Sequence, residues 1–435
     1  MHVIFVYVLI GLVYKIESLT FCDDQKCVCL NKNEGLKISC SSHSTVLAAN
    51  YTLSDNVTTL DLSRNNLTRI QRPLVSDTLI ELLLNSNQIE EIANDTLRLP
   101  SLKILDLSHN NLKFIHKDTF SQINNLECLN LTNNKFNAFG NINFYYLKKL
   151  QEIVFDDNNI GPSLENHSLF EGGLQLTKEI QSISLRNVNL TANNKHVFLD
   201  AREHLKKLIL SHNNMTDFID LPDKLVYLDL SSNPIKRIPR DVFIFTTDLS
   251  VLKLNNILIE EVQGFAFFYL CSLHHLELEK NRNLKQFSPL AWGRVIVKDQ
   301  IDLFVNNLTL RGSNLTSLDV KMAGIFKKIK RVDLRDNPWI CDCRIAWLQE
   351  IEIPEELMDF RCSSPSNLFN RRIHEVNSTE FICEEEKISE ESNPIITIAI
   401  YCILLTFAVL MMYFFIFSAK PFLYRQLPLE FPRTP

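Results

Sequence analysis

The chain has 435 residues, of which 46% are hydrophobic and only 10 are glycine, a composition typical of a folded protein. Its formal net charge of -6 at pH 7 is opposite to the basic character of nucleic-acid-binding proteins, so no nucleic-acid partner is expected. At this length two or three domains would be usual, but internal repeats override that expectation.

The chain begins with an uncharged apolar run, "VIFVYVLIGLVY" from Val3 to Tyr14, which the polar stretch Lys15 to Ser18 follows. This pattern predicts a secretory signal peptide over residues 1–18. The alternative is an uncleaved N-terminal anchor, but twelve apolar residues are short for a bilayer, which takes about 20.

Four cysteines follow within residues 19–56, where we expect an N-terminal cap: Cys22, Cys27, Cys29 and Cys40. An even-numbered cluster in a secreted chain indicates disulfides rather than metal ligands, so no metal or other cofactor is expected. Four cysteines allow three pairings, and their spacing does not choose among them.

The stretch "KILDLSHNNLKFI", residues 103–115, fits neither an amphipathic helix nor a single strand, and its pattern recurs. Written as L-x-x-L-x-L-x-x-N-x-L, the motif occurs twelve times within residues 57–339, mostly 20 to 25 residues apart, which is the spacing of leucine-rich repeats. The copies begin at Val57, Leu79, Leu102, Leu126, Leu150, Ile180, Leu205, Leu225, Leu249, Leu273, Val305 and Ile329.

Positions 3 to 5 of each copy are expected to form a short strand. Position 4 then points inward and positions 3 and 5 point outward, while the apolar residues at 1, 6 and 11 follow as the chain curls around the core. Because one coil cannot bury its own leucines, the copies are expected to stack.

Position 9 holds an asparagine in nine of the twelve copies, and we expect its amide to bond buried backbone groups of neighbouring coils. These residues are Asn65, Asn87, Asn110, Asn134, Asn158, Asn213, Asn233, Asn281 and Asn337. The other three copies have Val188, Ile257 and Ser313. Two of the three follow the longest intervals between copies, so loops are expected around residues 161–175 and 291–300.

A second cluster of four cysteines lies within residues 340–383, directly after the last copy: Cys341, Cys343, Cys362 and Cys383. A stacked solenoid exposes its core at both ends unless caps cover it. The two cysteine clusters lie at those ends, and we expect them to seal the solenoid.

The segment "CDDQKCVCLNKNEGLKISC", Cys22 to Cys40, resembles the N-terminal cysteine cap of extracellular leucine-rich repeat proteins, with Asp23 where that family usually has proline. The segment "NPWICDCRIAWLQEI", Asn337 to Ile351, closely resembles their C-terminal cap, and the layout is similar to Toll-type ectodomains and insect leucine-rich adhesion proteins. The resemblance implies the pairs Cys22–Cys29, Cys27–Cys40, Cys341–Cys362 and Cys343–Cys383.

Residues 395–418 carry no charge, and 24 residues at roughly 1.5 Å rise each reach about 36 Å, enough to cross a hydrocarbon core of about 30 Å. The acidic linker 384–394 precedes this span, and Lys420, Arg425 and Arg433 follow it, so the positive-inside rule places the N-terminal side outside the cell. We therefore expect a single-pass type I protein of the plasma membrane.

The predicted fold is thus an α/β-type solenoid: a right-handed leucine-rich repeat horseshoe with a parallel concave sheet, disulfide caps at both ends and one transmembrane helix. The predicted cytoplasmic tail, residues 419–435, is too short to bury a core, so no Toll-type signalling domain is expected there. Its "YRQL", from Tyr424 to Leu427, resembles a tyrosine-based endocytic sorting motif.

No metalloprotease, acyl-transfer or nucleotide-binding motif occurs, so an enzyme is not expected. His274 and His275 point in different directions in the predicted strand and are interpreted as solvated surface. Asp156 and Asp157 are neighbours that a turn explains better than a catalytic carboxylate pair does.

Outward positions 3 and 5 form the concave surface on which leucine-rich repeats commonly bind partners. Two apolar clusters occur there, and contiguous exposed apolar area often marks a protein contact, although such residues also simply suit a strand. The first cluster is Leu83, Ile104, Cys128 and Val154, and the second is Ile209, Tyr227 and Val251.

Eleven N-x-S/T sites are candidates for glycosylation, which needs an exposed asparagine. They are Asn50, Asn56, Asn66, Asn94, Asn130, Asn166, Asn189, Asn214, Asn307, Asn314 and Asn377. Asn130 and Asn307 fall on predicted concave strands, whereas Asn214 lies beyond its strand. The preferred binding surface is therefore the stretch between these two strands: Lys207, Ile209, Tyr227, Asp229, Val251 and Lys253.

Cys128 and Cys271 lie six copies apart, so strands spaced about 4.8 Å apart put them out of disulfide reach of each other. Cys271 is expected to be buried. Cys128 points outward and could bridge two chains, which makes a homodimer one expectation.

The leading interpretation is a cell-surface recognition protein, adhesive or an accessory receptor, that binds an extracellular protein ligand or co-receptor through its concave face. One alternative is an innate immune sensor or decoy for microbial ligands. A second alternative is a structural or matrix-organising membrane anchor.

Overall fold

The computed structural model describes residues 19–23, 27–32, 35–42, 51–70, 73–166, 169–170, 176–293, 304–383 and 404–412. The chain divides into two units, Met1–Ile382 and Cys383–Pro435. The predicted signal peptide, acidic linker and tail lie outside the described residues. The same is true of 171–175 and 294–303, which overlap the two expected loops.

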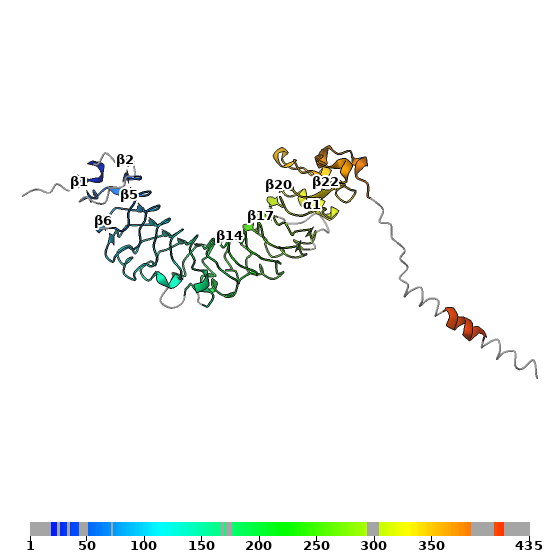
Figure 1. Ribbon diagram of the computed structural model, residues 1–435, viewed down its shortest axis with the longest axis horizontal. Coiled ribbons are helices and arrows are strands. Elements are labelled where there is room, and N and C mark those ends of the chain that lie inside the picture. Colours follow the sequence, from blue (N-terminus) through cyan, green and yellow to red (C-terminus); the bar gives the residue numbers. More distant parts are fainter. Residues whose placement is uncertain are drawn as a thin grey trace, which may run out of the picture. The chain divides into compact units, whose positions relative to one another are not determined.

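One sheet of 14 strands runs through the first unit and lines the inner side of its curve (Figure 1). Its order is β2 (Val28–Lys32), β3 (Gly35–Ser39), β5 (Val57–Asp61), β7 (Glu81–Leu83), β9 (Ile104–Asp106), β10 (Cys128–Asn130), β11 (Glu152–Val154), β12 (Ser182–Ser184), β13 (Lys207–Ile209), β14 (Tyr227–Asp229), β15 (Val251–Lys253), β17 (His275–Glu277), β19 (Asn307–Thr309) and β20 (Arg331–Asp333). Each of the twelve copies contributes one strand, which covers positions 3 to 5. Neighbouring copies pair in parallel at equal positions, as Tyr227 does with Val251, so the predicted register is confirmed.

The outer side of the coils carries short strands and single turns instead of α-helices. The strands are β6 (Leu74–Val75), β8 (Leu97–Arg98), β16 (Glu261–Val262) and β18 (Gln286–Phe287), and the 3₁₀ turns are η2 (Phe139–Asn141), η3 (Gly161–Leu164), η4 (Leu199–Ala201) and η5 (Val320–Met322). Within the described coils the one α-helix is α1 (Ala323–Phe326), with four residues. The predicted α/β class is therefore wrong, and the fold is a β-solenoid of about twelve turns. Coils of 20 to 25 residues leave too little chain for a helix beside each strand.

The leucines of successive coils share one continuous interior. In the third copy, Leu102, Leu105, Leu107 and Leu112 are all 0% exposed, and buried residues of the same cluster extend from Phe21 to Phe381. Each coil therefore covers the apolar face of the next, as the repeat spacing predicts.

Asparagines at position 9 form a ladder that joins neighbouring coils. Asn110 Nδ2 donates to the carbonyl of Leu107 in its own coil and to that of Leu84 in the coil before, both at 3.0 Å. Its Oδ1 accepts from the backbone N–H of Ile89 at 2.9 Å. Where the asparagine is replaced by Ser313, the hydroxyl still donates to the carbonyl of Leu278 at 3.1 Å.

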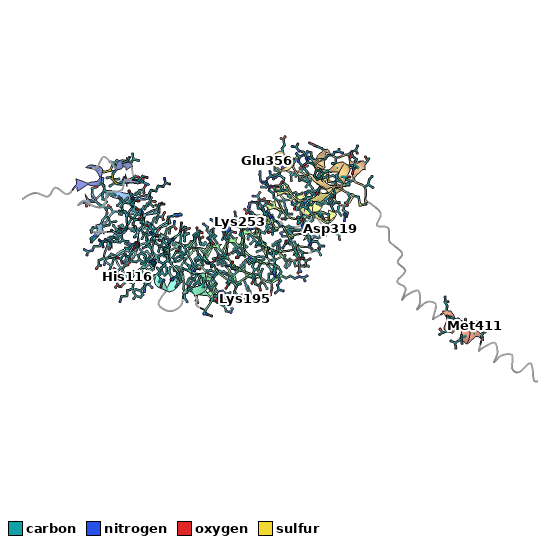
Figure 2. The ribbon with its side chains drawn as sticks, in the orientation of Figure 1. His116, Lys195, Lys253, Asp319, Glu356 and Met411 are labelled. Atoms are coloured by element: carbon teal, nitrogen blue, oxygen red, sulfur yellow. A yellow bond between two sulfur atoms is a disulfide. The ribbon has the colours of Figure 1, made fainter. Side chains whose placement is uncertain are left out.

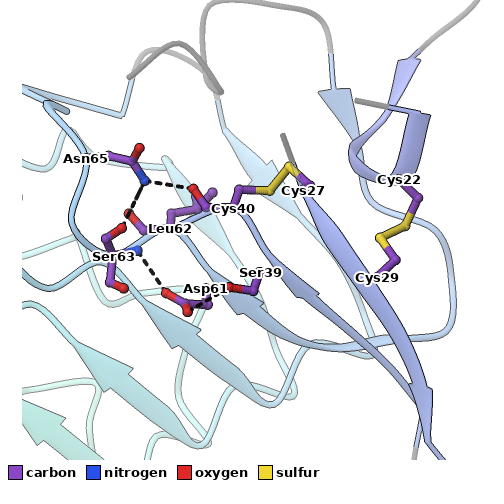
Figure 3. Close-up of a disulfide and its surroundings, with 9 residues drawn as sticks. All are labelled: Cys22, Cys27, Cys29, Ser39, Cys40, Asp61, Leu62, Ser63 and Asn65. Atoms are coloured by element: carbon purple, nitrogen blue, oxygen red, sulfur yellow. Dashed lines mark hydrogen bonds between the residues drawn. A yellow bond between two sulfur atoms is a disulfide. The ribbon is translucent and has the colours of Figure 1, made fainter. Parts of the chain in front are cut away.

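Disulfides lie at both ends of the solenoid. The N-terminal cap contains β1 (Leu19–Thr20), η1 (Phe21–Asp23) and β4 (Tyr51–Thr52), with the bonds Cys22–Cys29 and Cys27–Cys40 shown in Figure 3. The ladder reaches this cap, because Asn65 Nδ2 donates to the carbonyl of Cys40 at 3.1 Å.

The C-terminal cap packs against the last coil and comprises β21 (Trp339–Ile340), η6 (Ala346–Glu350), η7 (Glu355–Leu357), β22 (Cys362–Ser364), η8 (Ser366–Leu368), η9 (Ile373–Glu375) and η10 (Ser378–Glu380). Cys341 is bonded to Cys362, and Cys343 and Cys383 are also disulfide-bonded. The pairs Cys22–Cys29, Cys27–Cys40 and Cys341–Cys362 are those that the family resemblance implies.

Two cysteines of the described coils are free. Cys271 is exposed, so its predicted burial is wrong: it lies in the turn that enters the tenth copy, outside the apolar positions. Cys128 is half-buried in β10, where burial, with the charges of Glu152 and Asp106, raises the pKa of its thiol to about 11. This thiol is protonated at neutral pH.

In the second unit, residues 404–412 are helical, and their apolar side chains are exposed. These nine residues belong to the predicted transmembrane span 395–418, most of which lies outside the described part. No helix within the described ranges is long and apolar enough to cross a bilayer.

Candidate functional site on the concave surface

The preferred surface lies on four neighbouring strands, β13, β14, β15 and β17. Their middle residues, Leu208, Leu228, Leu252 and Leu276, are 0% exposed, so the flanking residues of each strand face the concave side. Pairing at equal positions arranges these side chains in two rows. Row one is Lys207, Tyr227, Val251 and His275, and row two is Ile209, Asp229, Lys253 and Glu277.

Tyr227 lies at the centre of row one and is half-buried. The ammonium groups of Lys207 and Lys253 each lie 6.0 Å from its ring centroid, at the outer limit of cation–π contact. Burial raises the pKa of the Tyr227 hydroxyl above its ordinary value. The site therefore presents a neutral aromatic ring between two cations.

Glu277 is the most heavily bonded residue of row two. Its carboxylate accepts from Lys253 at 2.9 Å, from His275 at 2.7 Å and from Asn255 at 2.6 Å. Burial opposes the charge of Glu277, but these hydrogen bonds outweigh it and lower the pKa of the carboxyl group. The network fixes Lys253 beside Tyr227.

Glu277→Gln is expected to destabilise the protein by roughly 1 kcal/mol at pH 7, since the ion pair is partly exposed. The pKa of Glu277 is lower in the folded state than its ordinary 4.5, so this contribution is present above about pH 4.5 and is lost as the pH falls further. Urea unfolding at pH 7 and pH 3 should therefore show a smaller difference between variant and wild type at pH 3. The exposed Glu260, changed to Gln, is the control, and an equal difference at both pH values would contradict the assignment.

The structure brings together only part of the predicted surface. Tyr227 and Val251 are direct neighbours, whereas Ile209 stands in the other row, opposite Asp229. In the first apolar cluster, Ile104 and Cys128 are direct neighbours, but Leu83 pairs with Asp106, and Cys128 pairs on its other side with Glu152. Charged residues therefore divide that cluster.

Sequence reasoning missed three members of the site: His275, Glu277 and Asn255. The interpretation of His275 as solvated surface is wrong, because its ring is half-buried and bonded to Glu277, while His274 is exposed. The repeat register could have found two of them, since His275 and Glu277 occupy positions 3 and 5 of the copy beside Val251 and Lys253. Asp156 and Asp157 lie in a turn, as predicted.

A cavity of about 660 Å³ adjoins row two at the ends of these strands. Ile209, Asp229, Lys253 and Glu277 line it, together with Arg186 and Lys280. Among the residues with described placement, no group of His, Cys, Asp or Glu could hold a metal ion. The geometry suits polar and charged contacts to a large partner.

The candidate glycosylation sites leave the central strands clear. Asn214 is exposed beyond β13, whereas Asn130 and Asn307 are half-buried within β10 and β19. The amide of Asn307 lies 3.2 Å from a ring nitrogen of His275, so a glycan there would border the site. Asn50 lies outside the described residues; Asn314 is half-buried, and Asn56, Asn66, Asn94, Asn166, Asn189 and Asn377 are exposed.

The chain matches a family model described as "Leucine rich repeat" over residues 77–136 and 223–282, and a second of the same description over 203–217. Tsukushi of Gallus gallus is 28% identical over 265 residues, which cover 58% of this chain and 67% of Tsukushi. Trophoblast glycoprotein of Mus musculus is 25% identical over 164 residues, which cover 37% of this chain and 32% of that protein.

Among solved structures, a chain from the octameric complex of Latrophilin 3, Unc5D and FLRT2 superimposes with a TM-score of 0.54 at 18% identity. The alignment covers 80% of this chain and 97% of that chain, so the two share a fold.

Proposed function

We propose that this chain, a leucine-rich repeat protein with a disulfide-bonded N-terminal cap, is a cell-surface recognition protein that binds an extracellular protein through strands β13, β14, β15 and β17. The observation that carries the proposal is the partly exposed aromatic ring of Tyr227 between two lysine ammonium groups, on strands that hold no glycosylation motif. A rigid aromatic residue beside cationic groups is typical of the residues that dominate protein interfaces.

The comparisons support protein binding at a coarser level. The FLRT2 complex joins a leucine-rich repeat chain to two other proteins, Latrophilin 3 and Unc5D. Its likeness to the present chain is one of fold, so the identity of the partner does not follow from it. The test is to screen the secreted protein, clustered on beads, against an array of extracellular proteins; failure to bind any protein partner would contradict the proposal.

We propose that residues 395–418 anchor the chain in the plasma membrane with the repeats outside. The uncharged sequence and the apolar, exposed side chains of the helical residues 404–412 support this. The full chain should stay in the membrane pellet after alkaline carbonate extraction, and an antibody to the repeats should label intact cells. Release by carbonate would contradict the anchor.

Two other functions are separable by experiment. Aggregation of cells that express the chain would favour adhesion, whereas capture of microbial ligands by the secreted protein without aggregation would favour a sensor or decoy. Neither behaviour is expected of a matrix-organising anchor.

Tyr227→Ala is expected to weaken binding to the partner found in the screen by roughly 10-fold to 30-fold, because the ring is the central partly exposed aromatic group of the site. Binding is measured by surface plasmon resonance, with secretion and thermal stability as checks on folding. Tyr145→Ala is the matched control, since the ring of Tyr145 also lies near a lysine ammonium, 4.8 Å from that of Lys148, but it is exposed and not on the concave strands. Equal affinities for wild type and Tyr227→Ala would reject this surface while leaving protein binding itself intact.

A further inference from the structure

The two ends of the 14-stranded sheet differ. At the C-terminal end, Glu356 of the cap lies against β20, where it accepts hydrogen bonds from Arg331 at 2.9 Å and from Arg335 at 3.2 Å (Figure 2 labels Glu356). At the N-terminal end, β2 is the last strand and pairs only with β3 among the described strands. Proteins usually cover or charge such an edge, because it is a template for pairing with another chain.

The backbone groups on the open side of β2 can be identified from β3. The N–H groups of Leu36 and Cys40 donate toward β5, to the carbonyls of Asn56 and Asp61. Alternation then directs the groups of Lys37 and Ser39 toward β2, where these residues pair with Leu30 and Val28. The N–H and C=O groups of Cys29 and Asn31 therefore point away from the sheet, and no described residue is bonded to them.

The side chains of β2 make this edge apolar. Cys29 pairs with the buried Ile38 and faces the core, so Val28 and Leu30 lie on the concave face. Their side chains are 60% and 54% exposed. A strand whose outward backbone groups bond to no described residue, and which has two exposed apolar residues on one face, is complementary to another strand of the same kind.

We propose that β2 pairs with β2 of a second copy of this chain, antiparallel and about a two-fold axis at Leu30. In this register all five residues of the strand are paired. Cys29 of each copy lies opposite Asn31 of the other, which supplies four backbone hydrogen bonds from the groups that point outward. Leu30 faces its own counterpart in a non-hydrogen-bonded pair, where Cα atoms approach to about 4.5 Å and side chains are closest.

The occupant is a second copy because the edge is self-complementary. The two-fold pairing places Leu30 of both copies together on the concave face, with Val28 of each copy next to them along the strand. It opposes no two like charges across the ladder, since Lys32, the one charged residue of the strand, pairs with Val28. The same patch of both chains is used, as in an isologous dimer. The small contact predicts a weak pair that favours membrane-bound copies, where local concentration is high.

Leu30→Cys in the full chain on cells should give roughly tenfold more disulfide-linked dimer than wild type, because the expected Cα separation suits a disulfide. The new thiol faces away from the cap disulfide of Cys29. Val28→Cys is the matched control: it is on the same face and equally exposed, but its counterpart lies about 14 Å away in this register, beyond disulfide reach. Non-reducing gels of surface-labelled protein measure the yield. A yield from Leu30→Cys no higher than that from Val28→Cys would overturn the proposal.

Charge exchange tests the pairing without a covalent bond. Leu30→Lys in both of two differently tagged full chains should reduce their co-capture roughly tenfold, because like charges then lie directly opposite. Combining Leu30→Lys in one chain with Leu30→Glu in the other should restore it, whereas Val75→Lys, at an exposed apolar residue of β6, should have no effect. Failure of the mixed pair to recover would exclude self-pairing at this edge.

Discussion

Asn213→Ala is expected to lower the free energy of unfolding by about 3 to 5 kcal/mol, since several buried backbone groups lose their partner together. Asn213 is 5% exposed, and its Nδ2 donates to the carbonyls of Leu185 at 2.7 Å and Leu210 at 2.9 Å. Its Oδ1 accepts from the N–H groups of Val188 and Leu190, both at 3.0 Å. These partners lie in two coils, so alanine leaves groups in both without a hydrogen bond.

Thermal and urea unfolding measure this loss, and hydrogen exchange shows where it falls. Because contacts in a repeat protein are mainly between neighbours, protection should drop first in the sixth and seventh copies. Asn283→Ala is the control, since Asn283 is exposed and its side chain makes no hydrogen bond to a residue of the described coils. A change below about 1 kcal/mol would contradict the role given to the ladder.

Replacing both Cys341 and Cys362 with alanine is expected to cost about 3 kcal/mol, the loop-entropy value for a bridge of this span. The two residues are 21 positions apart, and the bridge holds β22 beside Trp339, which is 0% exposed. Loss of the bridge should loosen the C-terminal cap and open the end of the leucine core.

Limited proteolysis followed by mass spectrometry measures this effect. Cleavage is expected first within residues 341–383, with the central coils still protected. Cys271→Ala, which removes an exposed free thiol, is the control for loss of a cysteine. Uniform loss of protection along the solenoid, or none at all, would show that this bridge does not secure the cap.

The strands, their register and the asparagine ladder are the features that the repeat motif predicted most fully. A leucine at position 4 and an asparagine at 9 recur because each coil meets the same neighbour geometry, so one motif fixes strand, register and ladder for all copies. The register Tyr227 to Val251 followed from the alignment of copies alone. The cap pairings followed from resemblance, since cysteine spacing leaves three choices.

The outer side of the coils could not be predicted in the same way. The motif as written ends at position 11 and assigns no structure to the rest of each coil, so the α/β expectation failed and Cys271 was placed in the core instead of a turn. The contacts of the site could not be predicted either, because Glu277 bonds to Lys253, His275 and Asn255, which occupy three different positions of the repeat.

The amino-acid sequence by itself determined the number of coils, their strands and their shared leucine core, because these depend on a pattern that every copy repeats. Only the tertiary structure decided which concave side chains touch, which carboxylate holds Lys253 beside Tyr227, and that β2 is the terminal strand of the described sheet with two exposed apolar residues. Those features depend on contacts between side chains of different coils, and positions 3 and 5 are the ones at which the motif leaves the residue free.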